Sequence, residues 1–509
     1  MHKKDIKAQV RKQLKTEFPN WHRLTRKEKK AIAQKVLDEI VSSYDYGKEI
    51  ETPMPELLGL SAQQLTKGIL TIEQMAEFVE GHQSDALLRL YGSHSTHPAI
   101  KDLELQIIDS LIDDRIINKL LSPEGYTPAS RVLFPHNLLR AEILKALKCP
   151  EISYRKFCGD DKTYENHKET SPYIGMENKQ NRAFIGLPLN RKEMIDHVQM
   201  SQFRSSLSFT QMINLNVYFL YLLQGKGMLD PFNVHFVDST ELAVDRQHLL
   251  AKFKIGNQNI RIYDDIDSDC GKRRNKRDKS VYVVGYRLHA LAAINPENGQ
   301  SIPLISVLAP ANHHDSHFML PLIQLGKSIG LDLKLITADE AYHDKDGALF
   351  TQTGVRVIAP PNQKVILPSN VDPETNQVTC DDFCEIGMDY VGSDSKGHEF
   401  KCASLPGQCP RMPVCPQYRH IDFDSGCFQP IPHATEGIAQ AIELRKNGER
   451  TFNLLKNREG LEYSRVRGQH NILAQSIFAT AATLLIEVAG TRRSTQPPHW
   501  QQLEFPSAA

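Results

Sequence analysis

Apolar residues recur at helical spacing through most of the first 150 residues of the chain. Two segments in this part open with the spacing of a helix capping box, Thr25–Glu28 and Thr71–Gln74. The pattern therefore predicts an α-helical N-terminal region over residues 1–150. Residues 151–232 follow as a polar loop and two further helices that lead into the next part of the chain.

From residue 233 the pattern changes to short alternating or continuously apolar segments, which are typical of β-strands. Between the later strand-like segments, apolar residues again recur at helical spacing. The order β-β-β-α-β-α-β predicts an α/β domain whose mixed β-sheet is flanked by helices, with its first part over residues 233–360. The strands are expected at 233–238, 281–294, 302–308, 333–338 and 355–359, and the helices at 316–329 and 344–353.

Residues 361–435 interrupt this domain, because they are rich in proline, glycine and cysteine and show little periodicity. Helical spacing returns over Gly437–Lys456 and again near 469–489, so residues 436–490 are expected to form the second part of the same domain. Residues 491–509 are expected to form a flexible tail. The interrupting segment is therefore a Cys-rich insertion in the α/β domain.

The most apolar late stretch, Ile472–Val488, contains Gln475, Ser476, Thr480 and Thr483. These polar residues favour a buried helix over a membrane span. The N-terminal residues lead into no apolar segment, so no signal peptide is expected. Nine cysteines in 509 residues do not make a disulfide scaffold. We therefore expect a cytoplasmic protein with no membrane partner.

Positive and negative charges balance over the whole chain, but they are unevenly distributed along it. Residues 1–35 hold twelve Lys or Arg against three acids, and a second basic run, Gly271–Lys279, includes Lys272, Arg273 and Arg274. Local patches of this kind indicate a polyanionic partner, because phosphate contacts are local. Each run taken alone is slightly more often solvated surface. The N-terminal helices predict either a helix-turn-helix-like DNA reader or a plain helical bundle.

Three acids occupy positions where the active sites of α/β proteins are built. Asp238 ends the first strand and Asp339 the fourth, and neighbouring strand ends form a crevice at the sheet edge. On the first late helix, Glu449 follows Arg445 by four residues and precedes Lys456 by seven, which places them on one face. Each acid alone is typical of a turn, a loop or a solvated helix. Together they predict a site for hard cations, Mg²⁺ or Mn²⁺.

With these motifs the chain resembles the DDE transposases of bacterial insertion sequences, over roughly residues 190–490. The tyrosine of the family's Y-x-x-R-x-x-x-E-x-x-x-x-x-x-K signature is replaced by Ile442, a departure from the pattern. The matched positions are Asp238-Ser239-Thr240, Asp339-Glu340-Ala341-Tyr342, and Arg445, Glu449 and Lys456 of the signature. Weaker similarities are Gly285–His289, Ala311–Asp315 and Ser201–Arg204.

The resemblance implies a ribonuclease H-like catalytic domain that nicks transposon ends and then joins the freed 3′-hydroxyl to target DNA. Asp238, Asp339 and Glu449 would be the catalytic residues and would hold two Mg²⁺ or Mn²⁺ ions about 3.5–4 Å apart. The partners would be double-stranded DNA, both the terminal inverted repeats read by the N-terminal helices and the target. The enzyme would act as a homodimer on paired ends, associated with the bacterial nucleoid when bound.

Six residues are candidate DNA contacts on different grounds. Two belong to the matched signature, one follows the second acid and would line the site, and three lie in the second basic run. They are Arg445, Lys456, Tyr342, Lys272, Arg273 and Arg274.

The Cys-rich insertion predicts either a structural Zn²⁺ site or a set of reduced thiols. The spacings between its cysteines are loose for zinc, and no C-x-x-C pair occurs. A small insertion with few apolar residues would nevertheless gain stability from a metal. The candidate ligands are Cys380, Cys384, Cys402, Cys409, Cys415 and Cys427, with His398, His420 and His433 nearby.

Two other functions fit the same sequence. A ribonuclease H-like nuclease would cut DNA without joining strands. A non-catalytic DNA-binding protein derived from a transposase would neither cut nor join, although the presence of all three acids argues against a decayed site.

Overall fold

The computed structural model of the chain describes most of its length, with gaps. The described residues are 2–45, 62–83, 97–122, 133–159, 171–190, 194–225, 227–245, 247–256, 258–274, 280–344, 347–359, 369–371, 377–380, 386–394, 396–403, 409, 417–422, 443–458, 460–463 and 466–488.

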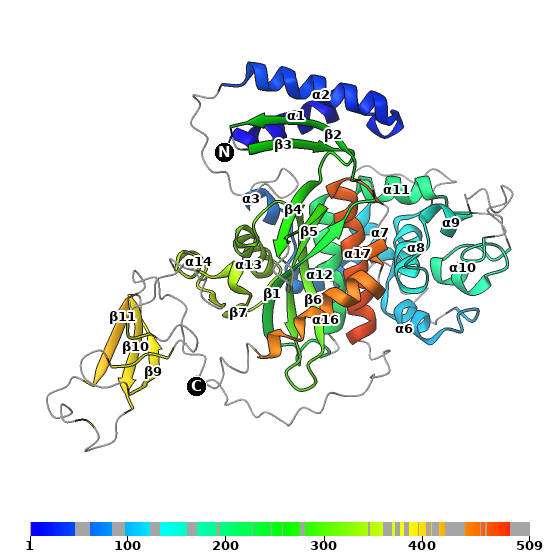
Figure 1. The fold of residues 1–509 in the computed structure, drawn as a ribbon. Coiled ribbons are helices and arrows are strands. Elements are labelled where there is room, and N and C mark those ends of the chain that lie inside the picture. Colours follow the sequence, from blue (N-terminus) through cyan, green and yellow to red (C-terminus); the bar gives the residue numbers. More distant parts are fainter. Residues whose placement is uncertain are drawn as a thin grey trace.

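A six-stranded mixed β-sheet forms the centre of the fold (Figure 1). The spatial order is β4-β5-β1-β7-β8, and the long strand β5 also pairs with β6 further along its length. Strand β1 is antiparallel to β5 and parallel to β7, and β7 is parallel to β8. The strands are β1 (Val234–Ala243), β4 (Asp269–Arg274), β5 (Ser280–Ile294), β6 (Ser301–Pro310), β7 (Leu335–Thr337) and β8 (Arg356–Ile358).

The prediction of a mixed α/β sheet flanked by helices is confirmed. All five expected strands are present as β1, β5, β6, β7 and β8. The helices expected between the last three strands are present as a 3₁₀ turn, η4 (Asp315–Phe318), followed by α13 (Met319–Ser328), and as α14 (Ala348–Thr353). The three strands of the polar excursion between Ala243 and Ser280 were not predicted.

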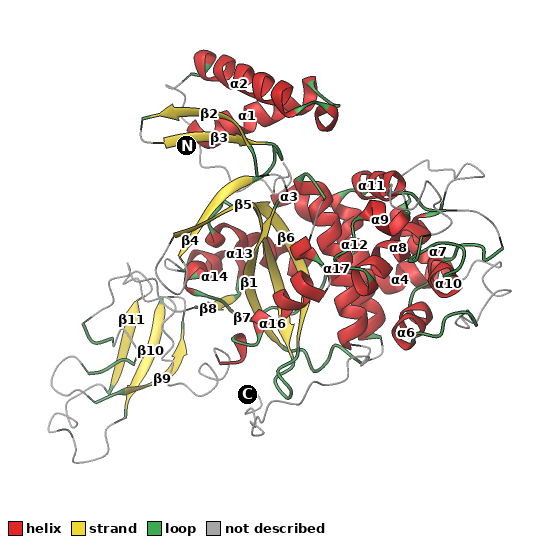
Figure 2. Ribbon diagram, turned by 45° about the vertical axis from the view of Figure 1, so that its right-hand side comes forward, coloured by secondary structure: helices red, strands yellow, loops and turns green. Residues whose placement is uncertain are grey.

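Helices from the first half of the chain gather beside the sheet and share one apolar core with it (Figure 2). The last helix, α17 (Gln469–Val488), is buried in this core as expected, including the polar side chains of Ser476, Thr480 and Thr483. The other helices of this layer are α3 (Ala62–Thr66), α4 (Ile72–Gln83), α6 (Leu103–Leu111), α7 (Asp114–Leu121), α8 (Pro135–Lys148), α9 (Tyr154–Cys158), α10 (Lys179–Ile185), α11 (His197–Ser206) and α12 (Phe209–Gln224).

The first two helices, α1 (His2–Glu17) and α2 (Arg26–Ser43), belong to a second core. They pack on a two-stranded hairpin, β2 (Leu249–Ile255) and β3 (Gln258–Tyr263), which is inserted between β1 and β4. The predicted capping box starts α2, where Thr25 and Glu28 bond to each other's backbone. The helical region predicted over residues 1–150 therefore contributes to two separate cores.

An acidic turn, residues 264–269, attaches this N-terminal module to the sheet. Lys7 pairs with Asp269, and Lys29 pairs with Asp264 at 2.7 Å, and all four side chains are buried. On its other side, the Asp265 carboxylate of this turn accepts hydrogen bonds from the Tyr286 hydroxyl and from the backbone N–H of residue 468. Some lysines of the basic N-terminus therefore form buried ion pairs within the protein.

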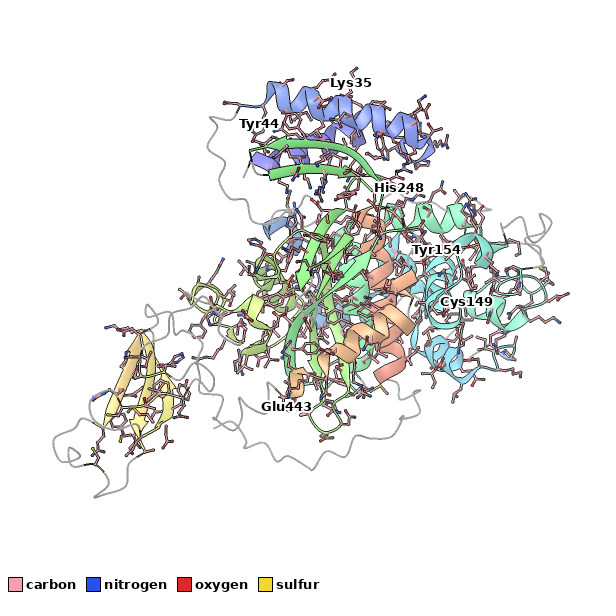
Figure 3. The ribbon with its side chains drawn as sticks, in the orientation of Figure 1. Lys35, Tyr44, Cys149, Tyr154, His248 and Glu443 are labelled. Carbon is pink, nitrogen blue, oxygen red and sulfur yellow. The ribbon has the colours of Figure 1, made fainter. Side chains whose placement is uncertain are left out.

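The continuous helix expected over Gly437–Lys456 is wrong in its described part. Residues 443–445 make one helical turn, and Figure 3 labels Glu443 at its start. After a turn at 446–447, α16 (Gly448–Asn453) begins and gives way to a π-helix, η7 (Leu454–Arg458). The changed helical period removes the regular stacking that placed the signature residues on one face. Residues 437–442 lie outside the described part.

Within residues 361–435, for which a Cys-rich insertion was predicted, the described residues include a small antiparallel sheet of order β11-β10-β9. Its strands are β9 (Met388–Ser393), β10 (Gly397–Cys402) and β11 (Tyr418–Asp422). Met388, Phe400 and Ile421 pack with Val371 and Val378 in a core of their own.

Across the described residues, we find no helix with the length and apolar character needed to cross a membrane.

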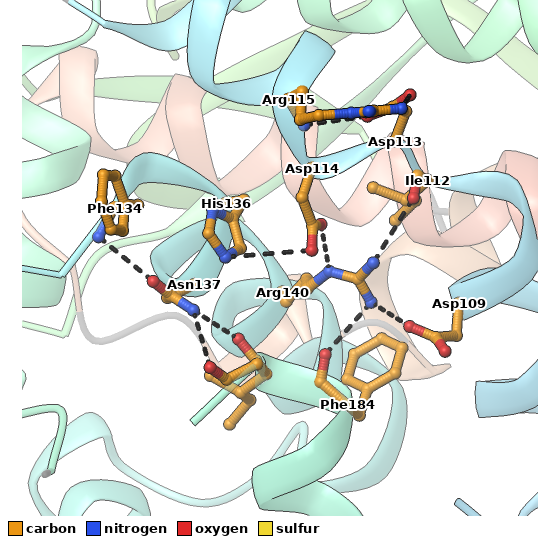
Figure 4. Close-up of polar contacts among 12 residues, drawn as sticks. Asp109, Ile112, Asp113, Asp114, Arg115, Phe134, His136, Asn137, Arg140 and Phe184 are labelled. Atoms are coloured by element: carbon orange, nitrogen blue, oxygen red, sulfur yellow. Dashed lines mark hydrogen bonds and ion pairs between the residues drawn. The ribbon is translucent and has the colours of Figure 1, made fainter. Parts of the chain in front are cut away.

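The helical layer is held together by a buried arginine (Figure 4). Arg140 of α8 donates to Asp114 and Asp109, at 2.6 Å each, and to the carbonyl oxygens of Phe184 and Ile112. Its side chain is only 4% exposed. One guanidinium group therefore joins α6, α7, α8 and α10, and it neutralises two aspartates that would otherwise repel each other.

Arg140→Met should destabilise the protein by about 3 kcal/mol, because two partly buried carboxylates and two carbonyls lose their donor. The measurement is the free energy of unfolding in urea. Arg115→Met is the matched control, since Arg115 is 42% exposed and pairs with Asp113 in the same region. Its loss should change stability by less than about 1 kcal/mol. Equal effects of the two substitutions would contradict this account.

Candidate active site

The parallel pairing of β1 with β7 sets the first two acids side by side. Phe236 of β1 pairs with Thr337 of β7. Asp238 lies two residues after Phe236, and Asp339 lies two residues after Thr337 with extended backbone, φ −82° and ψ 174°. Side chains two residues apart share a face, and adjacent strands are about 4.8 Å apart, so both carboxylates lie on one face of neighbouring strands.

Burial and mutual repulsion make the charged form of both aspartates unfavourable. The pKa of Asp238 is raised to about 6 by burial and by the negative charge of Asp339, against the Ser239 N–H that it accepts at 2.7 Å. Burial and the charge of Asp315 also raise the pKa of Asp339. Two hard carboxylates that resist ionisation in each other's presence form a donor set that suits a divalent cation.

A cation from the late helical segment faces this pair. The Arg445 Nη1 atom lies 3.9 Å from the Asp238 Oδ2 atom, and both side chains are largely buried. Arg445 lowers the pKa of both aspartates, but less than burial raises it. The structure therefore brings three of the predicted residues together: Asp238, Asp339 and Arg445.

The third acid, Glu449, lies on an element that contacts the same face, but its side chain is exposed. Gly448, the preceding residue, packs directly on the Phe236 ring, where an added Cβ would be 2.4 Å from the nearest ring carbon. A glycine is required for this approach of α16 to β1. Among the described residues, no three His, Cys, Asp or Glu side chains are arranged to hold a metal ion, so Glu449 is not gathered with the two aspartates.

The other candidate DNA contacts differ in their surroundings. Lys456 lies in the π-helix and pairs with Glu462 at 2.7 Å. Lys272 is exposed on β4, whereas the side chains of Arg273 and Arg274 lie outside the described part. Only Lys272 is thus seen open to solvent.

Tyr342 is buried behind the site, in the turn that follows Asp339. Its side chain is 1% exposed, and its hydroxyl lies 3.0 Å from Nδ1 of His289. His289 pairs with Ser239, the neighbour of Asp238, across β1 and β5. Burial and the charge of Arg287 hold the pKa of His289 well below its usual range, so the ring is neutral. The Tyr342 ring, a predicted DNA contact, is covered in this structure, and its hydroxyl contacts His289 behind the turn that follows Asp339.

Arg287 and Asp315 belong to the site, although the sequence marked them only within weak similarities. Arg287 donates to Asp315 at 2.5 Å and to Glu241 at 3.2 Å. Asp315 begins η4, which packs on the turn that follows Asp339. The Ala311–Asp315 loop could have indicated this residue, but its approach to Asp339 depends on an arginine from another strand.

The described part of residues 361–435 leaves the zinc prediction open. Among the described residues, Cys380, Cys402 and Cys409 are not joined in disulfides. His398 is buried, and His420 lies between Asp394 and Asp422 at 3.2 and 3.0 Å. The remaining candidates, Cys384, Cys415, Cys427 and His433, lie outside the described residues.

No known protein-family model matches the chain, and no curated protein matches it significantly.

The raised pKa of Asp238 predicts how stability depends on pH. A carboxyl whose pKa is raised by folding contributes stability that is complete below its unfolded pKa, near 3.8, and is lost as pH rises through about 6. Asp238→Asn removes the charge and keeps an acceptor for the Ser239 N–H. Above about pH 7 and without divalent cations, the variant should be more stable than wild type by about 2 kcal/mol.

Urea denaturation in the presence of a chelator measures this gain, and the gain should disappear near about pH 4, where Asp238 is protonated. The control is Asp332→Asn, at a side chain that is 78% exposed. It should shift stability by less than about 0.5 kcal/mol at either pH. An Asp238→Asn variant that is less stable than wild type at both pH values would overturn the electrostatic description of the site.

Proposed function

We propose that the chain is a DDE transposase that cleaves DNA at transposon ends and transfers the strands into target DNA. The observation that carries this proposal is the register of β1 and β7, which places Asp238 beside Asp339. Asp339 lies just past the end of β7, whereas β1 continues beyond Asp238 to Ala243, so the expectation that Asp238 ends its strand is wrong. Structural aspartates rarely occupy such a position, because the fold must bear their repulsion. A site that binds a cation during its reaction gives a reason for the arrangement.

The sheet supports the ribonuclease H-like assignment within this proposal. Three antiparallel strands, β1, β5 and β6, are followed by two strands that are reached through helices and pair in parallel. This agrees with the β-β-β-α-β-α-β order expected of that domain. The segment with β9, β10 and β11 lies between β8 and α16 in the chain, which supports its assignment as an insertion.

Asp238 and Asp339 would hold Mg²⁺ or Mn²⁺, with Glu449 as the third ligand. Such ions, when bound, activate a water or 3′-hydroxyl and stabilise the leaving oxygen of a phosphodiester. Glu449 directly follows the glycine that contacts β1. In this proposal α16 moves on binding DNA and turns the Glu449 carboxylate toward the aspartates.

The protein's own groups would position the DNA. Arg445, already beside Asp238, would contact a phosphate next to the reacting bond. Lys456 would add a second phosphate contact when its pair with Glu462 opens. The Tyr342–His289 hydrogen bond and the Arg287–Asp315 pair would keep Asp339 in place. The DNA partners would be the terminal inverted repeats and the target, bound by a homodimer.

The test uses a supercoiled plasmid that carries the DNA flanking the gene, incubated with the protein and Mg²⁺ or Mn²⁺. We expect nicks at fixed positions and joined products, both abolished by a chelator. Glu449→Gln should lose cleavage and keep DNA binding nearly unchanged, because an exposed side chain contributes little to the fold. Glu443→Gln is the matched control, an exposed glutamate in the preceding turn, and should cleave normally.

The products separate the alternatives. Cleavage without joining would assign a ribonuclease H-like nuclease. Binding without metal-dependent cleavage would assign a non-catalytic DNA-binding protein. A Glu449→Gln variant that still cuts would remove Glu449 from the catalytic set.

A further inference from the structure

The β2–β3 hairpin has two chemically different faces. Its apolar side chains, including Phe253 and Ile260, which pair across the strands, face the core of the N-terminal module. Lys252 pairs with Arg261, and Lys254 pairs with Asn259, on the opposite face. Since side chains alternate along a strand, this second face points away from α1 and α2.

The second face is positively charged and carries no compensating acid of its own. Residues 249–263 contain three cations, Lys252, Lys254 and Arg261, and no Asp or Glu. Lys252 and Lys254 are exposed. Some other cations of the module are engaged, because Lys7, Lys15 and Lys29 pair with the acidic turn.

The hairpin is held in place by several contacts. Leu250 and Ile262 are buried against the helices, and the Lys252 N–H bonds to Gln34 of α2. At the base of the hairpin, marked by His248 in Figure 3, the Asp264 N–H bonds to the His248 carbonyl. The charged face is therefore presented by a packed ribbon.

The same strand links this face to the candidate active site. Asp238 lies on β1, five residues before the strand ends at Ala243, which is roughly 17 Å of extended chain. The hairpin begins six residues later. In Figures 1 and 2 the hairpin lies beyond this end of the sheet, with α2 on its far side. Roughly 17 Å corresponds to about five base pairs of DNA.

We propose that the charged face of the β2–β3 hairpin binds the phosphate backbone of duplex DNA several base pairs from the reacting bond. Charge complementarity carries the assignment, because a two-stranded ribbon with a row of cations matches the closely spaced phosphates of a duplex. The inference rests on the proposed function for its DNA partner. It adds a contact surface that lies outside the motifs matched to the transposases.

The experiment measures the affinity of the full chain for a mixed-sequence DNA duplex as a function of salt concentration. The variant Lys252→Gln/Lys254→Gln is compared with Lys101→Gln/Lys334→Gln, which removes two other exposed lysines. Each lost phosphate contact lowers the salt slope by about 0.9. Between about 50 and 200 mM salt, the hairpin variant should therefore lose about tenfold less affinity than wild type. The control should follow wild type.

Each result decides a different point. An unchanged slope in the hairpin variant, or an equal change in both variants, would overturn the hairpin assignment, and the lysines would then serve only to keep the strand edges soluble. A changed slope in a protein that shows no metal-dependent cleavage would keep the hairpin assignment and reject the transposase. No binding by wild type would reject both. Matching melting curves establish that the variants are folded.

Discussion

The placement of two buried carboxylates on adjacent parallel strands is the constraint around which this fold is arranged. Asp238 and Asp339 follow directly from the register of β1 and β7, and neither can ionise easily beside the other. Arg445 lies beside Asp238, and Arg287 pairs with the neighbouring Asp315. Behind them, burial keeps the His289 ring and the Tyr342 hydroxyl neutral, because it lowers the pKa of His289 and raises that of Tyr342. A centre that costs stability and is supported so specifically is expected where chemistry, rather than packing, selects the residues.

The basic N-terminus serves the fold as well as any partner. Lys7 and Lys29 form buried ion pairs with Asp269 and Asp264. Part of the basic run that resembles a nucleic-acid-binding patch in the sequence therefore attaches the N-terminal module to the sheet. Desolvation lowers the pKa of Lys7 to about 8 even beside its aspartate. Such pairs give weak net stability but define one geometry, because either partner left alone would be a buried, uncompensated charge.

Local sequence patterns predicted many of the helices and strands. They failed where an element or a site residue depends on contacts with residues distant in the sequence. The five principal strands, α17 and the capping box at Thr25 were expected, since each depends on nearby residues. The β2–β3 hairpin was missed, although apolar and polar residues alternate on both sides of Gly256-Asn257 in the sequence. Its apolar face is buried by helices some 200 residues earlier in the chain. The break at residues 446–447 precedes Gly448, whose close contact with the Phe236 ring cannot be read from helical spacing. Asp315 likewise enters the site only through Arg287.

The core of the N-terminal module is built from two segments that are far apart in the sequence, and this determines when the module can form during synthesis. Helices α1 and α2 bury their apolar faces on β2 and β3, whose residues emerge from the ribosome more than 200 positions later. At about 5–20 residues per second, the two helices wait tens of seconds with that surface uncovered. Because isolated helices of this length are marginal in water, the first segment made is among the last to become stable. The N-terminal module is therefore completed only after the first strand of the central sheet has been made.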